Sequence, residues 1–294
     1  MSENVLDFKK IATEIILYIV MVLIAIVMII PFIYMVSIAF KTPEEMLVYP
    51  PKLFPQHFYL ENFRKVWEEF DLSRYFFNTV IVSVSKTILT VLTAVLAAYP
   101  FAKIDFPLRK VLFFLILATL MIPYHITVIP LFVLIRKIPF AGGNNIFGAG
   151  GTGWLNTLWS LIIPGYVSSF GIFLLTQFIS VLPDELFDAA RIDGCSEFVI
   201  FKNIVLPLVK PALTTLSVIS FQGTWNDFLW PLLVAQRPSV WTLQVALSQL
   251  NTQFSGSEWA QLMAGTTISI IPIMILFIIA QRYFVQGIAL TGIK

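Results

Sequence analysis

The sequence predicts an all-α integral membrane protein with about six transmembrane helices. Of its 294 residues, 58% are hydrophobic and only 12% are charged, well below the roughly 25% charged residues of soluble domains. Six separate stretches match the ~20 mostly apolar residues that a helix needs to cross the hydrocarbon core. One strongly patterned polar stretch, residues 183–208, interrupts this apolar background. We therefore expect a helical bundle in lipid with one specialised loop.

The first apolar stretch, 15–40, could be mistaken for a signal peptide because Lys9 and Lys10 precede it. Its apolar run is much longer than the roughly 7–15-residue core of a cleaved signal, so we expect a permanent helix, kinked at Pro31. The other five expected spans are, in order, 75–101, 111–135, 158–182, 212–235 and 262–284. The second and the fifth of the six spans, 75–101 and 212–235, are more polar than the others.

Six crossings place both termini on the same side of the membrane. Of the 19 lysines and arginines, ten fall on that side, eight on the other, and Lys86 lies inside the second span. The loops of the other side are longer, so basic residues are denser beside the termini, which predicts that both termini are cytoplasmic. The expected domains are a cytoplasmic N-terminus at 1–14, a transmembrane domain at 15–285 with outer loops at about 41–74, 136–157 and 236–261, and a cytoplasmic tail at 286–294.

The first outer loop contains a short amphipathic pattern at 60–70. Phe63, Val66, Trp67 and Phe70 recur there at helical spacing. Such a helix could lie on the outer membrane surface or pack on the protein's own outer face, and the sequence does not decide between the two.

The second outer loop is rich in glycine at 141–153, which raises the question of a nucleotide site. It lacks the GK[ST] ending, the preceding strand and the lysine of a phosphate-binding loop, and the rest of the sequence has no such motif. We therefore expect a flexible connector, and no ATP bound by this chain.

The polar loop 183–208 predicts two short helices at the membrane surface. Asp184 can cap the start of the first, Arg191 suits its negative end, and Gly194 can supply the left-handed residue that stops it. Ser196 is a plausible cap for the second helix, which runs towards Pro207.

Two adjacent small side chains, Ala189 and Ala190, lie on the first helix beside Leu186, Phe187 and Ile192. Small side chains allow another protein to approach a helix closely, while apolar neighbours fill its groove. This helix is therefore predicted to dock against a partner protein.

The loop resembles the EAA loop of binding-protein-dependent ABC importer permeases. The matching positions are Asp188-Ala189-Ala190, Gly194, Ile204 and Leu206-Pro207, with Asp in place of the family's Glu at the first position. The resemblance narrows to the MalG-like permeases of carbohydrate importers and covers nearly the whole chain. The motifs that carry this narrower likeness are residues 189–194, Leu206-Pro207-Leu208 with Pro211-Ala212-Leu213, Trp225-Asn226-Asp227-Phe228 with Trp230-Pro231-Leu232, and Gln281-Arg282-Tyr283-Phe284 with Gly287.

This resemblance implies a six-helix permease bundle in the bacterial cytoplasmic (inner) membrane. It also implies three partners: a second permease of MalG or MalF type, a pair of ABC ATPase subunits that hold ATP and magnesium, and an extracytoplasmic sugar-binding protein. The tail 286–294 is similar to one that reaches into the ATPase interface, although a frayed end is as plausible. The residues expected to couple to the ATPase are Asp184, Leu186, Phe187, Asp188, Ala189, Ala190, Arg191, Asp193, Gly194, Leu206 and Pro207.

Polar residues at membrane depth are candidates for a solute pathway, because they are costly there and usually face a cavity or a partner. Asp227 lies beside Gln222, Trp225 and Asn226, and an aromatic ring among amide and carboxylate groups suits a sugar. Alternatively, Asp227 pairs with Lys86 or caps a kink before Pro231. Tyr124 stays a further pathway candidate, whereas packing is the better interpretation of its neighbour His125.

Composition and clustering argue against other classes of protein. A net charge of +2 without a basic run gives no nucleic-acid surface, and Cys195 with two separated histidines cannot form a zinc site. The loops hold no convergent acid–base cluster or nucleophile, so we expect no catalytic residues. A secondary transporter or channel is the alternative, but it would carry its own coupling groups or repeated broken helices, which the sequence does not display.

Overall fold

The computed structural model describes residues 2–253 and 259–291, and every regular element within them is helical. The chain forms two compact units. Unit 1 comprises Met1–Leu72 with Gln249–Ile270, and unit 2 comprises Ser73–Ser248 with Ile271–Lys294. All-helical architecture agrees with the predicted fold class.

Unit 1 contains the long helix α1 (Ser2–Ala39), the short helices α2 (Pro43–Met46) and α3 (Glu61–Arg64), and a π-helix, η1 (Lys65–Glu69). Residues Thr13–Ala39 are long and apolar enough to span a membrane. Helix α1 continues through Pro31, and its apolar side chains are exposed over most of its length. This surface is therefore free to meet lipid or another protein.

The amphipathic segment predicted at 60–70 is helical and packs on its own unit. The Asn62 amide donates hydrogen bonds to the carbonyls of Ala39, at 3.0 Å, and Lys41, at 2.8 Å. The rings of Phe40 and Phe63 lie 4.9 Å apart, and Val66 is fully buried. These contacts favour packing on the protein's outer face over a helix lying on the membrane.

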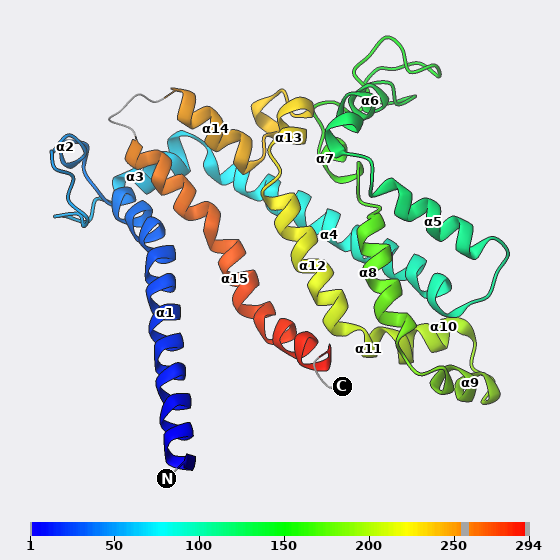
Figure 1. The fold of residues 1–294 in the computed structure, drawn as a ribbon. Helices are drawn as coiled ribbons and strands as arrows, with labels where there is room; N and C mark the ends of the chain where they lie inside the picture. The colour runs from blue at the N-terminus through cyan, green and yellow to red at the C-terminus, as the bar shows by residue number, and fades with distance from the viewer. Residues whose placement is uncertain (1, 254–258, 292–294) are drawn as a thin grey trace. The chain divides into compact units, whose positions relative to one another are not determined.

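Unit 2 is built on α4 (Leu72–Lys103), a 32-residue helix of about 48 Å that confirms the second predicted span. Helices α5 (Arg109–Thr119) and α12 (Lys210–Trp225) both pack against α8 (Ser169–Ser180) (Figure 1). A core of buried apolar side chains joins the end of α4 to α8 and to the start of α12. The remaining elements of the described part are α6 (Tyr124–Arg136), α7 (Trp159–Ile162), α9 (Asp184–Ile192), α10 (Glu197–Ile200), η2 (Phe201–Val205), α11 (Leu206–Leu208), α13 (Leu229–Val234), η3 (Pro238–Val240), α14 (Leu243–Gln253) and α15 (Trp259–Thr291).

Three predicted spans are not single helices. The third is split into α5 and α6, which meet at 97°, the fourth into α7 and α8, and the fifth into α12 and α13. Pro123 stands at the first break and Pro164-Gly165, with Gly165 at φ +74°, at the second. Proline lacks the amide donor and disfavours helix before it, so apolar composition alone overestimated helix continuity here.

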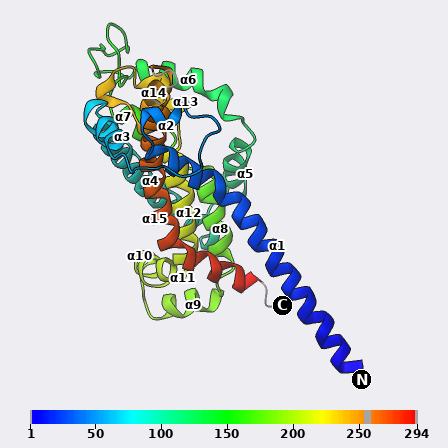
Figure 2. The same cartoon turned by 90° about the vertical axis from the view of Figure 1, so that its left-hand side faces the viewer.

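By length and composition, the described residues contain three continuous spanning helices, and up to six if each of three bent helix pairs counts as one span. Those pairs are α5 with α6, α8 with α9, and the segment Glu197–Leu208 with α12. The continuous ones lie at Thr13–Ala39, Leu72–Lys103 and Trp259–Gln281. Helices α9, α10 and α11 gather at one end of α8 and α12, and α6, α7 and α13 gather at the other, as both views show (Figures 1 and 2). The predicted tail 286–294 continues α15 as far as Thr291, and its side chains and last three residues lie outside the described part.

Candidate functional site

The polar loop folds as the two short helical segments that its sequence predicts. Helix α9 runs from Asp184 to Ile192, and Gly194 follows with φ +77°. The Gly194 amide donates to the Arg191 carbonyl and the Cys195 amide to the Ala190 carbonyl, each at 3.0 Å. Gly194 is therefore the left-handed stop of the helix, as expected.

The start of α9 is fixed by Lys103, a residue at the end of α4 that the sequence did not single out. Its ammonium lies 2.6 Å from the Asp184 carboxylate, donates to the Leu182 carbonyl at 2.6 Å and sits 4.8 Å from the centre of the Phe187 ring. The hydrogen bond from Lys103 lowers the pKa of Asp184. The prediction that Asp184 caps α9 is wrong, because Pro183 occupies the cap position and the carboxylate turns to Lys103 instead.

A second set of contacts fixes the end of α9. Arg191 binds Glu197 at 2.9 Å and lies 3.5 Å from Asp188, and the Tyr99 hydroxyl of α4 donates to Glu197. Hydrogen bonds from Tyr99 and then Arg191 lower the pKa of Glu197, and Glu197 in turn raises the pKa of Arg191. Ser196 occupies the cap position of α10 but its side chain makes no capping hydrogen bond there.

Helix α9 has an inner and an outer face. Phe187 and Ala190 are turned into the core of unit 2, at 1% and 9% exposed, and the Phe187 ring stacks on Tyr99. The prediction that these two residues form part of a docking surface is therefore wrong; they anchor the helix, since its alternating burial follows the helical repeat. The predicted coupling residues that are exposed are Asp184, Leu186, Asp188, Ala189, Arg191, Asp193, Gly194 and Pro207, while Leu206 is half-buried.

The fold joins α9 to the membrane-spanning part of unit 2 at both ends of the helix. Lys103 and Tyr99 lie one turn apart on the last part of α4. Lys103 binds Asp184 at the start of α9, whereas Tyr99 reaches its end through Glu197 of α10, which binds Arg191. Charged hydrogen bonds and a buried aromatic contact therefore link α9 to α4.

Trp225, predicted to stack on a sugar, is fully buried. Phe221 stacks on it at 5.5 Å between ring centres, and Phe76 approaches it edge-on at 5.6 Å. Both contacts occupy surface that a sugar ring would need, so the expectation of a stacking platform at Trp225 is wrong for this conformation.

Asp227 supports the helix break between α12 and α13 in the fifth span. This is the second alternative that the sequence left open, a cap for a kink before Pro231. Its carboxylate accepts a 3.4 Å hydrogen bond from the Trp230 amide at the start of α13. Lys86 is close enough to interact with it electrostatically. The other pathway candidates, Gln222, Asn226 and Tyr124, are exposed. Gln222 also lines a cavity of about 270 Å³ between α12 and α15.

A cavity of about 160 Å³ in unit 2, lined by both polar and apolar side chains, was not predicted. It is formed where α4, the break between α7 and α8, and α12 meet. The Ser168 hydroxyl accepts from the Gly171 amide and keeps its own hydrogen to donate. The signals in the sequence were the Pro164-Gly165 break and the small residues of α12 at helical spacing. The lining residues are Lys86, Thr90, Gly165, Ser168, Phe170, Leu216, Ile219, Ser220, Gly223 and Thr224.

These features define a class: a multi-pass helical membrane protein with cavities between its helices and a surface helix anchored to the end of α4. In the described part of the chain, no three His, Cys, Asp or Glu side chains converge as metal ligands would. The arrangement suits movement of a solute and transmission of force.

Residues 90–290 match the family of binding-protein-dependent transport system inner membrane components, and the chain belongs to this family. It is therefore a multi-pass inner-membrane permease of an ABC importer, a transport component and not an enzyme. It is 35% identical over 274 residues to the arabinooligosaccharides transport system permease protein AraQ of Halalkalibacterium halodurans, covering 92% of this chain and 93% of the relative. It is 33% identical to the lactose transport system permease protein LacG of Rhizobium radiobacter, covering 93% and 94%.

The fold agrees with this membership. A chain from the crystal structure of a bacterial ABC transporter involved in the import of the acidic polysaccharide alginate matches with a TM-score of 0.79 at 22% identity, over 92% of this chain and 95% of that one. A second match, with a TM-score of 0.65 at 16% identity, comes from the bacterial alginate transporter in complex with an alginate pentasaccharide-bound periplasmic protein; it covers 93% and 95%.

Proposed function

We propose that this chain forms half of the translocation pathway of an ATP-driven importer for a sugar or oligosaccharide. The relatives named for arabinooligosaccharides and lactose support a saccharide as cargo. The observation that carries the coupling role is the attachment of α9 to α4 at Lys103 and Glu197. Both termini lie in the cytoplasm in this proposal, on the same side as α9.

The partners follow from the family and from the surfaces left exposed. A second permease of MalG or MalF type completes the pathway, two ABC ATPase subunits hold ATP and magnesium, and an extracytoplasmic binding protein delivers the sugar. The outer face of α9, with Leu186, Ala189 and Asp193, is the part that meets an ATPase. Phe187 and Ala190 hold the helix in place from inside.

The mechanism is alternating access. Closure of the ATPases on ATP moves α9 as a rigid lever, because its ends are tied to the last part of α4 and its inner face is packed in the core. The movement rocks α4, α8 and α12 against the partner permease and exposes the pathway to one side and then the other. Gln222 and Asn226 line the pathway, and nothing in the chain reacts with the cargo.

Gly194→Val tests the proposal in the importer reconstituted in proteoliposomes. A Cβ built at Gly194 meets no atom within 4 Å, so the valine is not blocked by a clash and acts through the left-handed backbone. We expect uptake of labelled sugar to be lost, with ATP hydrolysis either lost or no longer stimulated by the loaded binding protein.

Gly150→Val is the matched control, because Gly150 also has a positive φ, +100°, and its added Cβ meets only an ordinary contact at 3.7 Å, but it lies in the glycine-rich loop 141–153 and not beside α9. It should leave stimulation of ATP hydrolysis intact. Normal uptake by Gly194→Val would overturn the lever mechanism. Uptake that continues without the ATPase subunits would instead favour the secondary-transporter alternative.

A further inference from the structure

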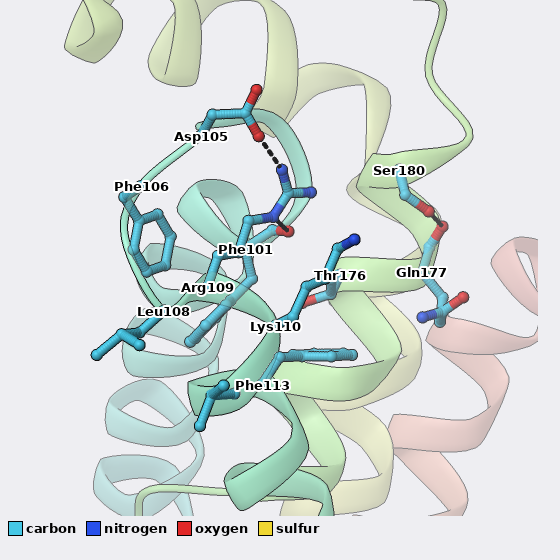
Figure 3. Close-up of a pocket in the computed structure, with 11 residues that line it drawn as sticks. Phe101, Asp105, Phe106, Leu108, Arg109, Lys110, Phe113, Thr176, Gln177 and Ser180 are labelled. Carbon is cyan, nitrogen blue, oxygen red and sulfur yellow. Dashed lines mark hydrogen bonds and ion pairs between the residues drawn. The ribbon is translucent and has the colours of Figure 1, made fainter.

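A cavity of about 600 Å³ in unit 2 is not explained by transport or coupling. It lies between the end of α4, the loop that follows, the start of α5 and the second half of α8 (Figure 3). Its lining residues are Phe101, Asp105, Phe106, Leu108, Arg109, Lys110, Val111, Phe113, Thr176, Gln177 and Ser180.

One wall of this cavity is apolar and mainly aromatic. The Phe101 ring lies 5.6 Å from Phe106 and 5.5 Å from Phe113. Leu108 and Val111 continue the wall and are more than half exposed, at 68% and 52%. A site for a small soluble anion or a sugar does not need such a wall, whereas an acyl chain does.

The rim of the cavity is basic. Arg109 is held in place because it donates to the carbonyls of Phe101 and Ala102 and pairs with Asp105 at 2.8 Å. Lys110 is exposed, and within the described part of the chain its ammonium has no hydrogen-bond or ion-pair partner. Figure 3 shows Lys110 extending between Arg109 and Thr176 while Arg109 turns to Asp105. Two cations against one carboxylate leave the rim positive.

We propose that this cavity binds one anionic phospholipid, with an acyl chain on the phenylalanine wall and the headgroup phosphate on Lys110. An apolar wall beside a basic rim at the end of membrane-spanning helices has the chemistry of an acidic lipid. The Gln177 side-chain amide lies on the opposite wall and is exposed, so it adds a neutral donor for headgroup oxygens. The Ser180 hydroxyl beside it already donates to the Gln177 carbonyl at 2.8 Å. The proposal does not depend on the cargo or on the role of α9.

Native mass spectrometry of the complete permease complex in detergent tests this proposal, with phosphatidylglycerol and phosphatidylcholine of identical acyl chains as probes. We expect the wild-type complex to retain phosphatidylglycerol in preference to phosphatidylcholine. Lys110→Gln should lower the apparent affinity for phosphatidylglycerol by about fivefold, the effect of removing one interfacial lysine. Excess inorganic phosphate should leave the bound lipid in place.

Lys210→Gln is the matched control, since Lys210 is also an exposed lysine in the first turn of a helix but does not line the cavity. It should leave binding unchanged. Val111→Trp fills the cavity from an exposed position and should weaken binding of both lipids, which tests the apolar wall separately. Intact assembly of each variant is read from the mass of the complex.

Four results would overturn the proposal. Equal retention of both phospholipids would show that the headgroup charge is not recognised. Unchanged binding of phosphatidylglycerol by Lys110→Gln would show that the lipid does not bind at Lys110. Displacement of the lipid by inorganic phosphate would leave only a small-anion site. A wild-type complex that retains neither lipid would mean that a partner subunit covers this face.

Discussion

The loop helix α9 and the segment around Trp225 contain the polar residues that the sequence singles out as candidate functional sites. The two regions differ in which of these residues are buried and which are exposed. The loop residues around α9 divide cleanly into an anchored inner face and an exposed outer face. Around Trp225, the aromatic residue is buried and the carboxylate of Asp227 supports a helix break. A polar cluster in a span is therefore weaker evidence for a binding site than a polar loop is for a docking site.

The difference has a physical origin. Residues of a surface loop pair with water or partners unless packing captures them, so exposure is their ordinary state. Residues inside a span must satisfy their polar groups within the protein, because lipid offers no hydrogen bonds. Asp227 does this by accepting a hydrogen bond from the Trp230 amide. A carboxylate at this position is therefore explained by the need to pair a backbone amide at the helix break, without a role in binding.

Trp225→Ala is the sharpest way to test the packing role of that segment. Removing a fully buried indole that contacts Phe221 and Phe76 should lower the free energy of unfolding by about 3 kcal/mol. Thermal denaturation of the purified complex measures this. Trp159→Ala, which removes a tryptophan that is 59% exposed, is the control and should change stability much less. Unchanged stability together with lost sugar uptake would instead support a role of Trp225 in stacking on the sugar.

Lys103→Met should separate ATP hydrolysis from uptake. The substitution keeps an unbranched side chain against Phe187 but removes the ammonium that binds Asp184 and the Leu182 carbonyl. Loss of charge-assisted hydrogen bonds of this kind should reduce sugar uptake per ATP by about tenfold. The ratio is measured in proteoliposomes.

Lys202→Met serves as the control for that ratio, because Lys202 is an exposed lysine of the same loop. It should keep the wild-type ratio. A normal ratio in Lys103→Met would mean that α9 transmits force by its buried face alone, through Phe187 and Ala190.

Acid should loosen α9 before it loosens the spans. The pKa of Asp184 and that of Glu197 are both lowered from their ordinary values of 3.8 and 4.5, so their contacts stabilise the loop above those values. This stabilisation declines as the pH falls below 4.5 and disappears once it is below the lowered values. Hydrogen exchange of α9, corrected for intrinsic rates, should report the change.

Glu197→Gln should remove part of that pH dependence, since the amide cannot titrate. Glu185→Gln is the control, because Glu185 is an exposed carboxylate of α9 itself; it should leave the dependence as it is in the wild type. Protection of α9 that stays constant between pH 6 and pH 3, about the range over which carboxylates titrate, would show that ion pairs do not hold the helix.

Much of the loop could be predicted from sequence because its signals are local. Gly194 stops a helix by its own backbone freedom, and Arg191 follows the charge preference of a helix end. Lys103 and Tyr99 were missed because they lie 81 and 98 residues from the carboxylates they bind, Asp184 and Glu197. Proximity of this kind is set by packing, which no spacing rule reports.

The fold shows the same division. Predictions of α1, α4 and the start of α15 needed only apolar length, and they hold. The breaks at Pro123 and Pro164-Gly165 were visible as residues, but whether a proline bends a span or ends a helix depends on what its neighbours pack against. The cavity at Lys86 forms at one such break, so it was missed together with the break.

Gln222→Ala and Asn226→Ala have the smallest expected effects. They test whether either of these two predicted pathway residues contacts the sugar. Both residues are exposed, Gln222 in the last turn of α12 and Asn226 at its C-cap, so truncation should spare assembly. Loss of a single hydrogen bond to sugar should raise the KM of uptake by about threefold in each variant. Gln236→Ala, an exposed amide outside α12, controls for changes in net polarity. An unchanged KM in both variants would assign sugar contact to the partner permease and leave α12 as a supporting wall.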